Sequence, residues 1–230
     1  MINRKDVNYQ RVLEETIRAQ EAAGERPRLL LHACCAPCSS YVLEYLARYY
    51  RITVLNYNPN ISPEAEFQVR NEEILRLVRE MPFPEERPEV IVGRYDPLRF
   101  YEAVKGHEED REGGARCEIC FRLRLTEAAE AARAGGFDYF TTTLSISPLK
   151  NAALLNQIGG ELAEQYGVPY LYSDFKKKNG YKRSIELSRE YGLYRQDYCG
   201  CVFSKREREA KKHPVGTSER AECAKNTEKG

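Results

Sequence analysis

Short apolar runs alternate with helix-like segments along most of this chain, and that alternation limits the folds open to it. The apolar runs are rich in Val, Ile, Leu, Tyr and Phe, as buried strands are, and turn residues separate them from amphipathic stretches. Strands and helices in regular succession predict an α/β domain with a doubly wound, mostly parallel sheet. We expect strands at 28–33, 52–57, 89–93, 137–143 and 168–173, and helices at 5–23, 39–50, 63–81, 96–106, 119–134 and 147–167.

Polar or reactive segments follow four of these strands at their carboxyl ends. They read HACCAPC, YNPN, TTTLSISP and YSDFKKK. In a parallel sheet the carboxyl ends of the strands share one edge, and ligands bind in the crevice outside it. The sequence therefore predicts a single site to which these four segments contribute.

The length of 230 residues fits one domain, which we place at 1–204, with an N-terminal helix at 5–23 and a C-terminal helical segment. Residues 205–230 carry eight Lys/Arg and five Asp/Glu, so we expect a charged, flexible tail in which Cys223 is incidental. No run approaches the roughly 20 apolar residues of a membrane span, and the opening MINRKDVNYQ lacks the core of a signal peptide. We therefore expect a cytoplasmic protein with no membrane partner.

Eight cysteines stand out in such a chain, because seven of them are clustered. Stable disulfides are disfavoured in a reducing cytosol, where clustered thiols more often bind metal or carry out redox chemistry. Two of the clusters adjoin predicted helix N-termini, whose dipoles favour thiolates. The clusters are Cys34, Cys35 and Cys38 after the first strand, Cys117 and Cys120 in a CxxC, and Cys199 and Cys201 in a CxC.

The spacing of these thiols indicates more than one metal. Successive side chains on an extended backbone point to opposite sides, so the adjacent Cys34 and Cys35 are predicted to serve two neighbouring sites. One zinc ion or one [4Fe–4S] cluster takes four ligands, and seven thiols exceed that number. We infer a cluster plus a second metal, or a cluster plus redox-active thiols. Two simpler interpretations stay open: buried cysteines that act as small hydrophobes, and structural zinc.

Taken together, these stretches resemble the QueH family of epoxyqueuosine reductases. The matching segments are LLLHACCAPCSSYVLEYL, NYNPNISPEAEF, CEICFRLRL, TTTLSISPLKN and DFKKKNGYKRSIELSREYGLYRQDYCGCVFS. The resemblance implies a nucleotide-hydrolase-like (HUP-type) α/β fold, as in ATP-using tRNA-modifying enzymes. HACCAPC stands where their phosphate loop would be, and the sequence has neither an SGGxDS-like loop nor GxxxxGK[ST]. We therefore do not expect ATP use.

The resemblance also implies an activity: reduction of the epoxide of epoxyqueuosine to queuosine, the last step in making this wobble-position base of tRNA. It implies a [4Fe–4S] cluster beside a mononuclear iron, held mainly by the seven clustered cysteines. In some members an aspartate replaces the cysteine that is Cys38 here, which suggests that Cys38 serves the mononuclear metal. Removing the epoxide oxygen takes two electrons, and a cluster normally passes one. We hypothesise that the second iron binds the oxygen as a Lewis acid and shares the second electron.

A basic segment near the carboxyl end indicates where substrate binds. Residues 174–206 carry nine Lys/Arg and four Asp/Glu in a chain that is +1 overall. A solvated basic loop explains this excess, and so does a phosphate-binding surface for a tRNA anticodon stem-loop, with aromatic residues that stack unpaired bases. The predicted substrate contacts are Tyr194, Arg195, Gln196, Lys176, Lys177 and Asn58.

Several single residues have two interpretations. Asp174, which we predict to be catalytic together with Cys38, is a candidate general acid or metal ligand, or a turn cap. Tyr194 is equally compatible with a packed core position, and the Asn58 segment with an ordinary Asn-Pro turn. His32 is expected to be buried and hydrogen-bonded, and Lys150 either reaches a phosphate or starts a helix.

Two other functions remain open at this stage. A zinc-stabilised RNA-binding module would contain zinc and no sulfide. A thiol–disulfide oxidoreductase using Cys117 and Cys120 would leave five clustered thiols unexplained. The reductase interpretation requires an electron donor, which the sequence does not identify.

Overall fold

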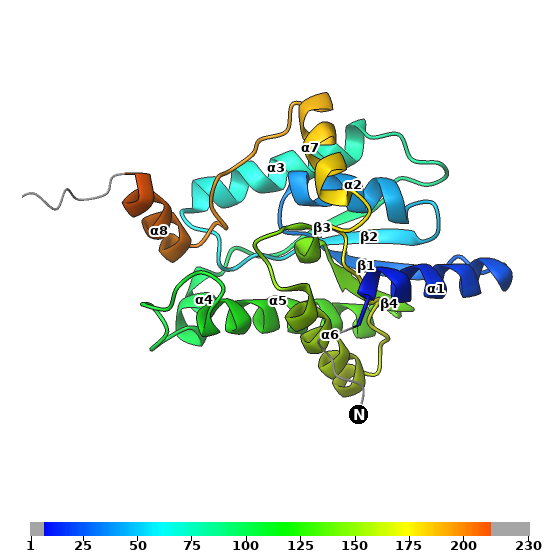
Figure 1. The fold of residues 1–230 in the computed structure, drawn as a ribbon, viewed down its shortest axis with the longest axis horizontal. Helices are drawn as coiled ribbons and strands as arrows, with labels where there is room; N and C mark the ends of the chain where they lie inside the picture. The colour runs from blue at the N-terminus through cyan, green and yellow to red at the C-terminus, as the bar shows by residue number, and fades with distance from the viewer. Residues whose placement is uncertain (1–6, 213–230) are drawn as a thin grey trace, which may run out of the picture.

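The computed structural model describes residues 7–212, and its centre is a parallel sheet with the strand order β3-β2-β1-β4. The chain steps outward from β1 to β2 and β3 and then returns to the other side of β1 for β4 (Figure 1). This reversal confirms the predicted doubly wound sheet and creates a topological switch point between β1 and β4. The strands are β1 (Arg28–His32), β2 (Arg51–Asn56), β3 (Glu89–Val92) and β4 (Tyr139–Thr142).

Helices cover both faces of the sheet. In Figure 1, α2, α3 and α7 lie on one side of it, and α5 and α6 lie on the other. Side chains along β1 point alternately to the two faces of the sheet. Leu29 and Leu31 pack into the core on the α2 side, and Leu30 packs into the core on the α5 side. The helices are α1 (Tyr9–Ala22), α2 (Ala36–Leu46), α3 (Glu64–Glu80), α4 (Pro97–Ala103), α5 (Ala115–Ala134), α6 (Ala152–Tyr166), α7 (Gly180–Glu190) and α8 (Val202–Lys212).

The prediction of a fifth strand at 168–173 is wrong. Only Tyr170 bridges to Phe140, through bonds from Phe140 N to the oxygen of Pro169 and from Leu171 N to the oxygen of Phe140. Pro169 has no N–H to extend the ladder. Beyond the bridge, the Asn156 side chain hydrogen-bonds to both backbone groups of Ser173. It accepts from the N–H of Ser173 at 2.9 Å and donates to its carbonyl oxygen at 2.8 Å. An amide side chain thus replaces the missing strand partner.

Helix α2 begins three residues before Ser39, where the sequence predicted its start. Its N-cap is Cys35, and the hydroxyls of Ser39 and Ser40 bond back to the carbonyl oxygens of Cys35 (2.8 Å) and Pro37 (3.0 Å). Pro37 suits the first turn because that turn needs no N–H there. Cys38 therefore lies inside the first turn of α2, at the positive end of the helix dipole.

At the carboxyl end, α8 crosses the predicted boundary at residue 204. Phe203 anchors it against Phe100 and Tyr101, and Glu207 accepts from Arg116 at 2.9 Å, so the start of the predicted flexible tail is helical. Residues 213–230, with Cys223, lie outside the described part of the chain. Within residues 7–212, no helix combines the length and the apolar character that crossing a bilayer requires.

Candidate metal centre

A cavity of about 200 Å³ opens at the switch point, beyond the carboxyl ends of β1 and β4. The two ends are tied together, because Cys34 N donates to the hydroxyl of Thr143 at 3.3 Å. Of the four segments predicted to meet here, HACCAPC and TTTLSISP line the cavity. YNPN lies behind the cysteines, and YSDFKKK contributes no lining residue among those described. Segment 195–199 supplies much of the remaining wall.

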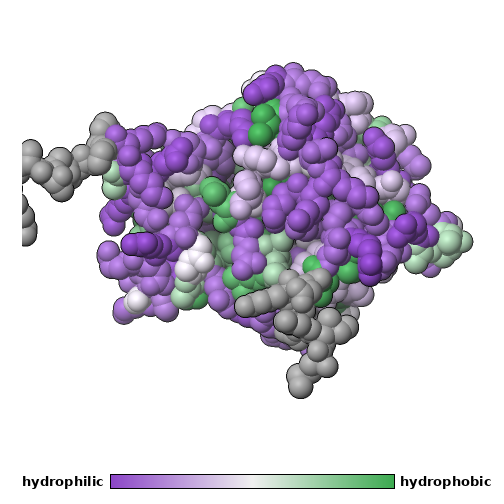
Figure 2. All heavy atoms as spheres, viewed as in Figure 1, coloured by the Kyte–Doolittle hydropathy of each residue, from purple (hydrophilic) through white to green (hydrophobic). Residues whose placement is uncertain are grey.

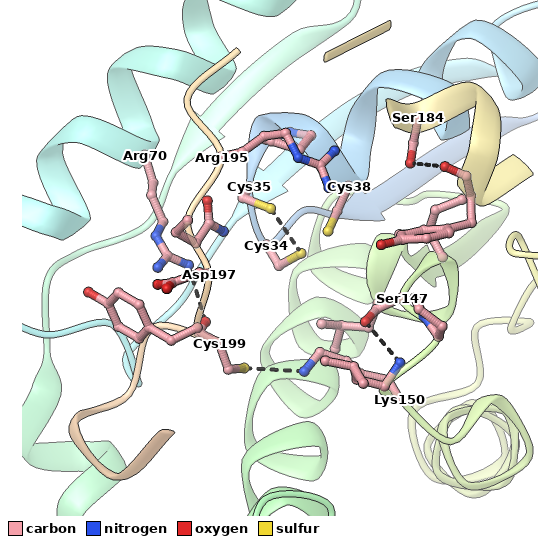
Figure 3. A pocket seen from close by; sticks show the side chains of 18 of the residues that line it. Cys34, Cys35, Cys38, Arg70, Ser147, Lys150, Ser184, Arg195, Asp197 and Cys199 are labelled. Carbon is pink, nitrogen blue, oxygen red and sulfur yellow. Dashed lines mark hydrogen bonds between the residues drawn. The ribbon is translucent and has the colours of Figure 1, made fainter. Parts of the chain in front are cut away.

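Cys34, Cys35 and Cys38, the three-cysteine set, gather on the floor of this cavity (Figure 3). Their sulfurs all lie within 4.8 Å of one another, and the sulfurs of Cys34 and Cys35 are 3.7 Å apart. Tetrahedral coordination at about 2.3 Å separates two sulfurs by roughly 3.8 Å, so this set can hold one metal ion. The prediction that Cys34 and Cys35 point to opposite sides is wrong, because the chain turns from β1 into α2 at these residues.

The three thiols share their protons unequally. Hydrogen bonds from Cys35 and Cys38 hold the pKa of Cys34 well below its usual value. The same contact with Cys34 raises the pKa of Cys35 to about 12, and the pKa of Cys38 is raised well above its usual value by Cys34 and Cys35. Cys35 and Cys38 therefore hold their protons more tightly than Cys34 does, and a metal ion bound by all three sulfurs must displace them.

Cys117, Cys120, Cys199 and Cys201, the four-cysteine set, line one enclosed void beside the cavity. The first pair lies at the start of α5 and the second pair directly before α8. Burial raises the pKa of Cys117, that of Cys120 to about 11 and that of Cys201 to about 12. Among the described residues, these sulfurs belong to no group of three ligand atoms that lie close enough together to bind a single ion.

Lys150 connects the two sets. Its Nζ donates to the sulfur of Cys199 at 3.2 Å (Figure 3). The same nitrogen lies 5.5 Å from the centre of the Phe121 ring. Burial acts to lower the pKa of Lys150, but the negative charge of Cys199 more than offsets it and raises that pKa above its usual value. The prediction that Lys150 starts a helix is wrong, since α6 begins at Ala152. The prediction that it reaches a phosphate stays a prediction, because Lys150 also lines the cavity.

Two buried guanidinium groups, those of Arg70 and Arg124, also face the cavity. Arg70 donates to the oxygen of Cys199 at 3.1 Å and pairs with Glu66, and Arg124 donates to the oxygen of Asn58. Sequence reasoning missed both, although helical spacing offered a signal for one. Arg124 is four residues after Cys120 and therefore lies on the same face of α5.

A buried scaffold holds the cysteine loop in place. His32 accepts from the Thr142 hydroxyl at 2.8 Å and donates from Nε2 to the oxygen of Tyr57 at 3.0 Å, because a carbonyl can only accept. This confirms the prediction that His32 is buried and hydrogen-bonded. Burial lowers the pKa of His32 to about 3, so the ring is neutral. Asn58, predicted to contact substrate, is buried instead, donating to the oxygen of Ala33 at 2.9 Å and accepting from Arg124.

The remaining predicted residues divide between the cavity and its surroundings. Arg195 and Gln196 line the cavity, and Tyr194 hydrogen-bonds to Glu66 and Glu73 on α3. Asp174 is buried outside the cavity lining, paired with Lys176 at 2.7 Å. Lys177 is exposed. Sequence reasoning also missed Asp197 and Tyr198 in the lining.

Comparison with known proteins places these features in a family context. The family model described as "Epoxyqueuosine reductase QueH" matches residues 29–207, which include both cysteine sets. Relatives of that name come from Staphylococcus epidermidis (44% identity over 207 residues, 89% of this chain and 87% of the relative) and Streptococcus pyogenes (43% over 199 residues, 86% and 78%). A further relative of that name, from Thermotoga maritima, is 37% identical over 186 residues, 80% of this chain and 93% of the relative.

Proposed function

This chain belongs to the epoxyqueuosine reductase QueH family, and on that premise we propose that it reduces the epoxide of epoxyqueuosine, at the wobble position of tRNA, to queuosine. The reaction consumes two electrons and two protons and releases the oxygen as water. The observation that carries the proposal is the gathering of seven cysteines, from three distant segments, into two neighbouring sets at one cavity.

The three-cysteine set would hold a mononuclear iron. Its support is the close spacing of three sulfurs, which suits one ion, and the cavity beside it, which leaves room for a further ligand. Cys38 lies in this set, in agreement with the assignment that the family resemblance suggests. Arg70 and Arg124 lie close enough to balance the negative charge that three thiolates around one divalent ion retain.

The four-cysteine set would hold the [4Fe–4S] cluster. Such a cluster takes one thiolate on each of four irons, so its ligands stand further apart than those of a single ion. The four cysteines line one void, and their sulfurs form no group close enough together for a single ion among the described residues, which matches that requirement. The support lies in the donor set and not in the volume of the void, which is about 10 Å³. When bound, the two metal groups would supply the electrons and a Lewis acid for the epoxide.

Two side chains of the segment before Cys199 are suited to hold the modified base. The Arg195 guanidinium lies over the three-cysteine set in Figure 3 and donates one hydrogen bond, to Ser188 at 3.1 Å, which leaves further N–H groups for substrate oxygens. The Gln196 carbonyl oxygen is buried and has no hydrogen-bond partner among the described residues. It could accept from the N–H edge of a guanine-like base.

The partners in this proposal are a tRNA anticodon stem-loop and an electron donor that the chain does not identify. Exposed cations on segment 177–189 (Lys177, Lys182 and Arg189) support contacts with RNA phosphates next to the cavity. The thiol–disulfide alternative is disfavoured, because raised pKa values at Cys117 and Cys120 make them poor thiolate nucleophiles.

The test is anaerobic reduction of tRNA that carries epoxyqueuosine, with a low-potential chemical reductant and mass spectrometry of the released nucleosides. We expect loss of one oxygen atom by the wild type. Cys38→Ala and Cys120→Ala should both abolish it, and Cys223→Ala, which alters the one unclustered cysteine, should retain it. Full activity of Cys38→Ala with an intact cluster would contradict the two-metal arrangement.

A further inference from the structure

Two exposed side chains line the rim of the cavity. Leu149 is 77% exposed, the highest value among the large hydrophobic residues of the described chain, and Tyr181 is 37% exposed. Both line the cavity and both face solvent, which places them at its opening. Two exposed apolar side chains that share the opening of one cavity form a surface that a ligand entering the cavity can cover.

Both residues rest on firm supports. The Ser147–Lys150 turn is closed by bonds from Leu149 N to the Ser147 hydroxyl (3.3 Å) and from Lys150 N to the Ser147 oxygen (3.2 Å). Lys150 points inward to Cys199, whereas the side chain of Leu149 is exposed to solvent. Tyr181 follows Gly180, where a side chain would overlap the oxygen of Phe175 and the ring of Tyr41. The backbone at both rim residues is therefore fixed at the opening of the cavity.

The volume of the cavity indicates which part of a substrate must lie outside it, against the rim. At about 200 Å³ the cavity is smaller than the roughly 300–1,000 Å³ of pockets that enclose a whole small ligand. It can take a base with its substituent, but the sugar, phosphates and neighbouring nucleotides must stay outside. In Figure 3, Ser147 and Ser184, on the two segments that carry the rim residues, lie on one side of the three cysteines, and Arg70 and Asp197 lie on the other.

We propose that Leu149 and Tyr181 form a stacking rim that holds a nucleotide adjacent to the modified one, so that an RNA loop binds more tightly than the free nucleoside. This inference rests on the proposed function. The Tyr181 ring offers a face for a base, and Leu149 packs against the unstacked base step. Exposed Lys177 and Lys182 flank Tyr181 in sequence and favour phosphates at the same place.

The test compares an epoxyqueuosine anticodon stem-loop with epoxyqueuosine nucleoside. Leu149→Ala and Tyr181→Ala should each raise KM for the stem-loop about tenfold at nearly constant kcat, without changing KM for the nucleoside, and Tyr181→Phe should restore the stem-loop value. The matched control is Leu98→Ala, on α4, which removes a leucine that is 67% exposed and lies outside the cavity lining. A wild type that reduces only the stem-loop fits the proposal equally.

A binding measurement gives a second readout without turnover. The probe is the stem-loop with 2-aminopurine replacing either nucleotide that flanks the wobble position. Its fluorescence should be quenched by the wild type at one of the two positions, and this quenching should be lost in Leu149→Ala and Tyr181→Ala.

Three outcomes overturn the inference while the proposed function stands: unchanged KM in both alanine variants, an equal rise in KM for the nucleoside, or a change of oligomeric state with stem-loop binding intact. The last would make the rim a contact between copies of the chain. If the wild type reduces neither substrate, the proposed function fails, and the inference falls with it.

Discussion

The ammonium nitrogen of Lys150 lies 3.2 Å from the sulfur of Cys199, and this partly buried contact joins the cavity to the four-cysteine set. A buried ammonium needs a negative partner, because desolvation otherwise drives off its proton. A metal-bound thiolate keeps its charge, so the contact suits a cluster ligand. It also places a fixed positive charge between the two cysteine sets.

Lys150→Gln removes that charge while keeping a hydrogen-bond donor. Reduction adds negative charge to a cluster, so we expect the midpoint potential to fall by roughly 60 mV, which corresponds to a factor of ten for one electron. Lys150→Arg should lower it less. The measurement is a redox titration followed by electron paramagnetic resonance, with exposed Lys105→Gln as the control. A potential equal to that of the control would contradict the electrostatic role.

Gly200, between Cys199 and Cys201, has a φ of 117°, and an added Cβ would lie 2.9 Å from Arg70 Nη1 and 3.0 Å from Ile61. We expect Gly200→Ala to destabilise the fold by about 1–3 kcal/mol and to lower sulfide per chain, because the CxC turn cannot keep both thiols inward. Gly192→Ala is the matched control, with a φ of 56° and no described atom within 4 Å. Equal sulfide in both variants would contradict this account.

Asn58→Ala leaves the buried Arg124 guanidinium without its acceptor and the oxygen of Ala33 without its donor. We expect a loss of about 2–4 kcal/mol in unfolding free energy and unchanged KM in the protein that still folds. Asn58→Asp, which keeps the acceptor, should lose less. Thermal unfolding and steady-state kinetics make the comparison. A raised KM at unchanged stability would contradict this structural role and support the substrate contact that the sequence predicted for Asn58.

The neutral His32 predicts a loss of stability in acid. Its folded pKa of about 3 lies below its ordinary value of 6.5, so the unfolded chain takes up the proton first as pH falls. The stabilising contribution is complete above about pH 6.5 and is lost progressively toward pH 3, about 2 kcal/mol of it by pH 5. Unfolding at pH 7, 6 and 5 measures this, and His32→Asn should have a flatter pH dependence. His107→Gln is the control. A wild-type slope equal to that of His32→Asn would rule out this role.

Much of the fold could be predicted because periodicity reports burial directly. The run 28–33 with its neighbours predicted a parallel sheet covered on both faces, and Leu29, Leu30 and Leu31 do divide between two cores. The fifth strand failed because its ladder depends on backbone N–H groups, which Pro169 lacks and which Asn156 takes at Ser173. Pro169 is a local signal against a strand that the prediction overlooked, whereas the competition from Asn156 leaves no local pattern.

The candidate site was predictable where spacing alone brings groups together, and not where the chain turns. CxxC and CxC motifs identified the segments that supply the four-cysteine set. The rule that adjacent side chains diverge fails at Cys34 and Cys35, because they lie in the turn between β1 and α2. Arg70 was hidden because it occupies an apolar position of α3, beside buried Phe67, Asn71 and Ile74. Its partners come from the distant CxC segment.

The most direct test of the central claim is the iron, zinc and acid-labile sulfide per chain after anaerobic purification. We predict about four sulfides and five irons for the wild type and for Cys223→Ala. Cys38→Ala should lose one iron and keep the sulfide, whereas Cys120→Ala should lose the sulfide. Stoichiometric zinc without sulfide, persisting after iron–sulfur reconstitution, would contradict the reductase proposal, and loss of sulfide from Cys38→Ala would contradict the assignment of the two cysteine sets.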